Sequence, residues 1–123
     1  MTFHISEAKY DKLLEDMQEV VRKTILENPV ELEFCAGFGP GIETPMRIGF
    51  ESLLYKLTDN QMNDKMFILS AEIFDRLESF MIGFNAIKGL ENYSIDDVVD
   101  ACNTILDESL SSIISSKIDV DFQ

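Results

Sequence analysis

The chain has 123 residues with 23 acidic and 10 basic side chains, which gives a formal net charge of −13. A field of that sign repels nucleic acid and anionic lipid, so it argues against direct nucleic-acid binding and membrane binding and favours a basic protein surface as partner. Hydrophobic residues make up 46% of the chain and charged residues 27%, too apolar for a disordered acidic tail, so we expect a single globular domain over residues 1–123.

No apolar stretch approaches the ~18 residues that a membrane-spanning helix needs, and charged residues begin too early for a secretory leader. Cys35 and Cys102 show no metal-ligand spacing and are typical of buried free thiols in a reducing compartment. We therefore expect a cytoplasmic protein.

Residues 6–28 carry the clearest helical pattern, because apolar side chains from Tyr10 to Ile25 recur at steps of three and four. Ser6 suits the N-cap position, and Pro29 prevents the helix from continuing. The sequence predicts an amphipathic helix here, with one charged face.

After this helix, apolar residues recur at every second position. Apolar and acidic residues alternate, which predicts a strand with one wet face over residues 30–36. The alternating residues are Val30, Glu31, Leu32, Glu33 and Phe34.

A glycine-rich loop is predicted next, over Gly37–Gly41, because its glycines permit unusual backbone angles and Pro40 blocks strand pairing. The segment lacks the Lys-Ser/Thr of a phosphate-binding loop. Phe38 stands between two glycines, where an aromatic ring is either a contact anchor for a partner or a hydrophobic plug.

Two interpretations compete for residues 44–57. Thr44 as N-cap with Pro45 at the first helical position favours a helix. The alternation of Met46, Ile48 and Phe50 with polar or small residues favours a strand. We expect a strand over residues 46–51 and a short helix over residues 52–57.

After turn residues 58–64, a long helix is predicted over residues 65–88. Its main apolar stripe runs from Met66 and Phe67 onwards, yet Ile68, Leu69 and Ile82 fall outside it. An apolar arc this wide indicates a helix that is central to the fold or shared with another subunit.

A last helix is predicted over residues 94–115, because Ser94 followed by Asp97 resembles a capping box. The chain then alternates again around Asp119 and Asp121, which predicts a second strand with an acidic face. The expected fold class is α+β, with three main helices packed on a small, mainly antiparallel sheet.

The outward face of the last helix is the first candidate site. It carries a row of carboxylates that can imitate a phosphate backbone and bind a basic protein surface, although an ordinary solvated helix face accounts for the same pattern. These residues are Asp96, Asp97, Asp100, Asp107 and Glu108.

The acidic strands are weak candidates for a metal site. Carboxylates on adjacent strands would repel unless a cation such as Ca²⁺ or Mg²⁺ lay between them, whereas on separate strands they only solubilise the protein. The residues are Glu31, Glu33, Asp119 and Asp121. Neither a cofactor nor a resident metal is expected.

The sequence does not predict an enzyme. His4 is the sole histidine, and a Cys35–His4 pair is conceivable only if their two predicted strands adjoin.

Three functions remain open. The first is a small inhibitor or antagonist that docks its acidic helix 94–115 on a basic patch of a partner, as a nucleic-acid mimic. The second is a self-associating structural protein whose helix 65–88 pairs with a second copy as a homodimer. The third is a small-ligand or divalent-cation binding protein that uses Gly37–Gly41 or the acidic strands.

Overall fold

The structure is a computed structural model that describes residues 2–33, 37–88 and 94–122, without the side chains of residues 31, 33 and 84–88. Its elements in chain order are β1 (Phe3–Ile5), α1 (Glu7–Glu27), α2 (Pro29–Glu33), α3 (Pro40–Leu57), α4 (Asn63–Lys88), α5 (Ile95–Ser115) and β2 (Val120–Phe122).

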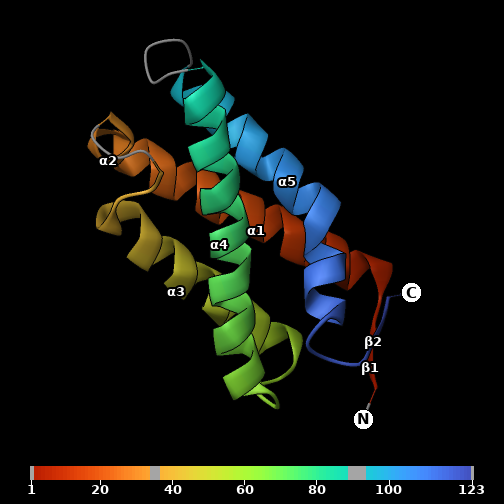
Figure 1. The fold of residues 1–123 in the computed structure, drawn as a ribbon. Coiled ribbons are helices and arrows are strands. Elements are labelled where there is room, and N and C mark those ends of the chain that lie inside the picture. Colours follow the sequence, from red (N-terminus) through yellow and green to blue (C-terminus); the bar gives the residue numbers. More distant parts are fainter. Residues whose placement is uncertain (1, 34–36, 89–93, 123) are drawn as a thin grey trace.

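Four long helices form a bundle, with α1 crossing behind α4 in the view of Figure 1. Each of the four helices packs against two others: α1 against α3 and α5, and α4 against the same two. The protein is therefore mainly helical, and the expected α+β fold is wrong. The β-structure in the described residues is one pair of three-residue strands, and they run parallel instead of antiparallel.

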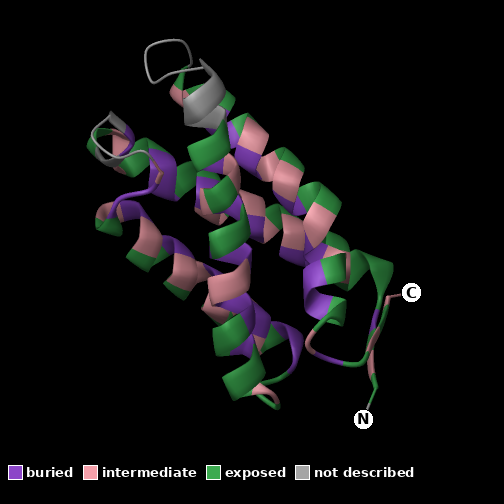
Figure 2. Ribbon diagram, in the orientation of Figure 1, coloured by how far each residue is buried: buried purple, intermediate pink, exposed green. Residues whose placement is uncertain are grey.

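Apolar stripes of all four long helices meet in one core, which Figure 2 shows as the inward-facing buried bands of the ribbons. Phe50 of α3 and Phe74 of α4 are among the largest fully buried side chains. Burial of a side chain of this size stabilises the fold by about 1.5–3 kcal/mol. The bundle thus rests on the helical periodicity of its apolar residues.

The predicted first helix is confirmed as α1. The Ser6 hydroxyl accepts a hydrogen bond from the Lys9 amide at 3.1 Å, which satisfies one of the free amides at the start of the helix. At the other end, the Asn28 amide donates to the Ile25 carbonyl, and Pro29 begins the next helix.

The strand predicted over residues 30–36 is wrong where the structure describes it, because residues 29–33 form α2. Pro29 suits the first position of a helix, because an amide at that position makes no hydrogen bond within the helix. Val30 is 57% exposed whereas Leu32 is 4% exposed, so the alternating apolar residues do not share one buried face. Residues 34–36 lie outside the described residues.

The strand predicted over residues 46–51 is also wrong. One helix, α3, begins at Pro40 with Gly39 as N-cap and encloses both Thr44 and Pro45. Its buried residues recur at steps of three and four, while Ile48 is 60% exposed. The buried residues are Ile42, Met46, Phe50, Leu54 and Leu57.

The turn after α3 is confirmed. Asp59 and Asn60 have φ angles of 51° and 61°, a left-handed conformation that Asp and Asn tolerate better than most residues. The following helix α4 starts slightly earlier than predicted, at Asn63. Phe67 is 55% exposed although the pattern placed it on the main stripe, and Leu69 is buried although the pattern placed it outside.

The last helix is confirmed as α5, together with its capping box. The Ser94 hydroxyl accepts from the Asp97 amide, and the Asp97 carboxylate accepts from the Ser94 amide, both at 3.1 Å. A C-cap at Gly89 is a prediction that falls outside the described residues.

The two strands lie near the two ends of the chain and pair with each other, with Phe3 opposite Val120 and Ile5 opposite Phe122. The Phe3 amide donates to the Asp119 carbonyl at 2.8 Å. The ring of Phe122 meets that of Tyr10 edge to face, with centroids 4.9 Å apart, and so ties the sheet to α1. Along the described parts of the chain, no helix is both long and apolar enough to span a membrane.

Candidate functional site

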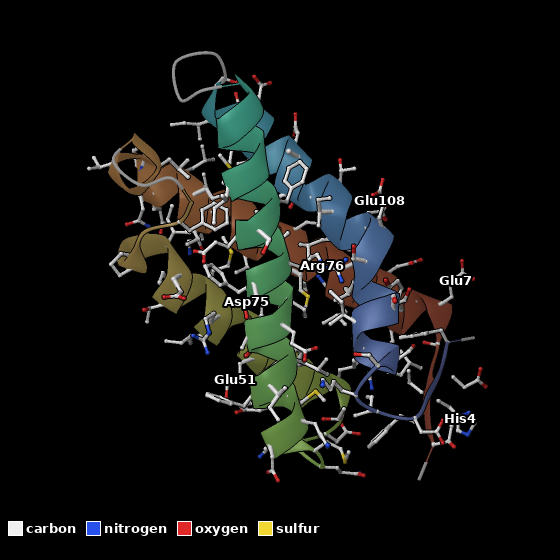
Figure 3. All side chains as sticks on the ribbon, in the orientation of Figure 1. His4, Glu7, Glu51, Asp75, Arg76 and Glu108 are labelled. Carbon is white, nitrogen blue, oxygen red and sulfur yellow. The ribbon has the colours of Figure 1, made fainter. Side chains whose placement is uncertain are left out.

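All five carboxylates predicted as a partner surface are exposed on α5. Asp96, Asp100 and Asp107 recur at steps of four and seven, which places them along one side of the helix. Figure 3 shows Glu108 on the outer side of α5 and Glu7 beside the start of α1. Asp97 differs from the others because its carboxylate is engaged in the capping box.

A shallow hollow of about 480 Å³ lies between α1 and α5, next to this row of carboxylates. Gln18 belongs to α1, and its side-chain amide donates to the Asn103 carbonyl of α5 at 3.2 Å. The Thr104 hydroxyl donates to the Asp100 carbonyl at 2.9 Å. The hollow is lined by Gln18, Asp100, Asn103, Thr104 and Asp107.

Asn103 has an amide oxygen, Oδ1, that is buried and accepts no hydrogen bond from any residue that the structure describes. A buried acceptor without a donor costs free energy, and such groups are uncommon in folded proteins. The acceptors that α5 exposes to the hollow are the carboxylates of Asp100 and Asp107, so this wall of the hollow is negatively charged. It is chemically complementary to a donor-rich, positively charged group.

The acidic surface continues onto α1. Burial raises the pKa of Tyr10, its hydrogen bonds with Ser111 oppose the rise, and the carboxylates of Asp107 and Asp11 add to it. Both carboxylates therefore lie near the Tyr10 ring. We call Asp11, Asp96, Asp100 and Asp107, together with the hollow beside them, the α1–α5 acidic surface.

Phe38 lies in the core. Its side chain is 7% exposed, and its ring centroid is 5.8 Å from that of Phe74. The ring acts as a hydrophobic plug between the start of α3 and the middle of α4, so we leave it out of the candidate surface.

The four weak metal candidates do not share a sheet. Glu31 and Glu33 belong to a helix, while Asp119 and Asp121 lie at β2, whose partner is β1. Across the described residues, no three metal-ligating side chains come close enough to hold an ion.

The residues considered for nucleophilic catalysis give no assembled site within the described part of the chain. The His4 ring is 3.4 Å from the Asp121 carboxylate at the exposed edge of the sheet, and Cys35 lies outside the described residues. Cys102 is a buried free thiol, and burial raises its pKa to about 12, so the thiolate does not form near neutral pH.

The uncharged residues that line the hollow between α1 and α5 were not predicted from the sequence as part of a site. Asn103 and Thr104 share the face of Asp100 and Asp107, and that spacing was a usable signal. Gln18 has no local signal, because only the packing of α1 against α5 brings it there.

Neither a protein-family model, nor a curated protein, nor a solved structure matches this chain. Its function must therefore be argued from its own residues.

Proposed function

We propose that this protein binds a basic surface of another protein through the α1–α5 acidic surface and acts as an inhibitor by covering that surface. The observation that carries the proposal is the row of exposed carboxylates of Asp96, Asp100 and Asp107 along one side of α5, with a hollow beside Asp100 and Asp107. An arginine suits this position because its guanidinium offers five N–H donors in a rigid planar fork.

Helix geometry indicates how many basic side chains the surface takes. Asp96 and Asp100 lie ~6 Å apart along the helix axis, and Asp100 and Asp107 lie ~10 Å apart. One guanidinium does not span the longer interval. The partner therefore presents at least two basic side chains, one of which enters the hollow beside Asp100 and Asp107.

A partner with basic side chains in a row is typical of proteins that bind nucleic-acid backbones. On this proposal the carboxylates of α5 take the place of phosphates, and the protein competes with nucleic acid for its partner. Association is then fast at low salt and weakens as salt screens the charges.

The test is a nuclear magnetic resonance titration with a capped peptide of alternating arginine and serine. We compare a triple variant, Asp96→Asn, Asp100→Asn and Asp107→Asn, with a control triple, Asp59→Asn, Asp64→Asn and Asp75→Asn. Both variants lose three negative charges, and all six positions are exposed. We expect the first triple to weaken binding about tenfold, since each charged contact contributes up to about 1 kcal/mol, and the control to change it little.

An equal loss in both triples would show that net charge alone attracts the peptide and would overturn the site.

A second candidate function is self-association through the outer side of α3 and α4. Ile48 and Phe67 are among the most exposed large apolar residues, and they line one hollow of about 140 Å³. The net charge of −13 on each copy opposes this pairing unless salt screens it. A monomer by sedimentation at tens of micromolar in high salt would remove this candidate.

A further inference from the structure

A second groove lies between α1 and α3 and has the opposite character to the α1–α5 acidic surface. It is a hollow of about 230 Å³ whose floor is formed by Leu13 of α1 and by Leu53 and Leu57 of α3. Leu13 and Leu57 are buried and Leu53 is half-buried, so the floor is apolar and open to solvent at Leu53. We call this hollow the α1–α3 groove.

The rim of the α1–α3 groove is basic. It carries Lys9, Lys12 and Lys56, three of the ten basic residues in a chain whose net charge is −13. Asp16 is the acidic residue on the rim, and its carboxylate pairs with the Lys12 ammonium at 2.8 Å. Among the described residues no ion pair engages Lys9 or Lys56, so two ammonium groups face the groove uncompensated.

Helix stability does not account for Lys9 on α1. Lys9 lies in the first turn, where a positive charge opposes the helix dipole, and Lys9 and Lys12 are like charges at a spacing of three. Lys56 lies in the last turn of α3, where the dipole does favour a cation. Lys9 therefore sits at a local cost that an anionic ligand would offset, whereas Lys12 is stabilised by its ion pair with Asp16.

The two binding surfaces lie on different faces of α1. Lys9, Lys12 and Asp16 recur at steps of three and four on the face towards α3. Asp11 and Gln18 are seven residues apart and belong to the face towards α5, where Gln18 contacts Asn103. The N-terminal half of α1 thus places Lys9 and Lys12 on a different face from Asp11.

We propose that the α1–α3 groove binds an acidic segment of another protein that carries one large apolar residue. The apolar side chain lies on the leucine floor, and carboxylates on either side of it pair with Lys9, Lys12 and Lys56. A peptide fits better than a free small molecule, because pockets that enclose a whole small ligand span about 300–1,000 Å³, more than the groove provides. One apolar anchor with charged neighbours is the usual arrangement of such contacts.

The probe is a set of capped twelve-residue peptides, each with one central Leu, Phe or Trp between aspartates and glutamates, titrated into protein with labelled leucine methyl groups. We expect the methyl signals of Leu13, Leu53 and Leu57 to shift. The triple variant Lys9→Gln, Lys12→Gln and Lys56→Gln should weaken binding about tenfold. The control Lys23→Gln, Lys65→Gln and Arg76→Gln removes as many positive charges elsewhere and should leave affinity within about twofold.

Three outcomes would overturn the proposal. The first is that peptide shifts only the methyl signals of leucines outside the groove. The second is an equal loss of peptide affinity in the lysine triple and in the control triple. The third is that decanoate saturates the groove while no peptide shifts any methyl signal. The last result would assign the groove to a free amphipathic anion. Loss of binding when the central apolar residue of the peptide is replaced by serine would support the anchor.

Discussion

Gly49 determines how closely α3 lies against α1. A Cβ atom added at this position would lie 2.8 Å from Cγ1 of Val20, closer than two carbon atoms approach without displacement. Val20 is β-branched and has few rotamers, so its methyl groups have little freedom to move away. The glycine is therefore a packing requirement of the α1–α3 interface.

The first prediction concerns this contact. We expect Gly49→Ala to lower the free energy of unfolding by about 1–3 kcal/mol, because overpacking outweighs the gain in helix propensity. Gly83→Ala is the matched control, since nothing lies within 4 Å of the added atom, and it should stabilise α4 by about 0.5–1 kcal/mol. Urea unfolding midpoints measure both.

The double variant with Val20→Ala distinguishes a clash from other causes. If the methyl groups of Val20 are the obstacle, the double variant will be more stable than the sum of the two single variants predicts. Strict additivity would mean that Gly49 is needed for another reason.

Single residues also show what the sequence could and could not predict about the candidate site. The exposure of Asp96, Asp100 and Asp107 follows from the helical period of their apolar neighbours, and the sequence predicted it. The buried oxygen of Asn103 depends on how α1 covers α5. No spacing along the chain encodes that contact.

At the scale of elements, α3 contains a proline that a helix interior disfavours. Pro45 has no amide hydrogen, so it cannot donate to the Gly41 carbonyl one turn earlier. The helical interpretation of residues 44–57 placed Pro45 at the first helical position, whereas in the structure Pro40 takes that position with Gly39 as N-cap.

The second prediction follows from this placement. We expect Pro45→Ala to raise the free energy of unfolding by about 1–2 kcal/mol, since the restored hydrogen bond outweighs the added freedom of the unfolded chain. Pro40→Ala is the control, because the first helical position loses no hydrogen bond to proline, and it should not stabilise the protein. Equal effects of the two substitutions in urea unfolding would contradict the assigned helix start.

The two wrong strand predictions share a physical cause. Residues spaced two apart also include pairs spaced four apart, so Met46 and Phe50 fit a strand and a helix equally well. Tertiary packing decides between them, because only α3 as a helix buries these two side chains while it exposes Ile48. Long segments with a charged opposite face, such as α1 and α5, left no such ambiguity.

At the scale of the whole molecule, the net charge of −13 affects folding and binding in opposite directions. Like charges repel one another within the compact state, and salt relieves this repulsion. Salt also weakens the attraction between the α1–α5 acidic surface and a basic partner.

The third prediction combines these effects. Added sodium chloride should raise the midpoint of thermal unfolding, measured by circular dichroism, while it lowers affinity for the arginine peptide. The Asp96, Asp100 and Asp107 triple variant should show a smaller rise, because it carries three fewer negative charges. A midpoint that falls with salt would mean that attractive ion pairs, such as Lys117 with Glu72 at 3.1 Å, outweigh the repulsion.

The parallel pairing of β1 with β2 has a mechanical consequence. Parallel strands place the start of β1 and the end of β2 at opposite ends of their small sheet. A pulling force applied before β1 and after β2 therefore shears the strands past each other and loads their hydrogen bonds together instead of one by one. The helices of the bundle come under tension only after β1 and β2 have separated.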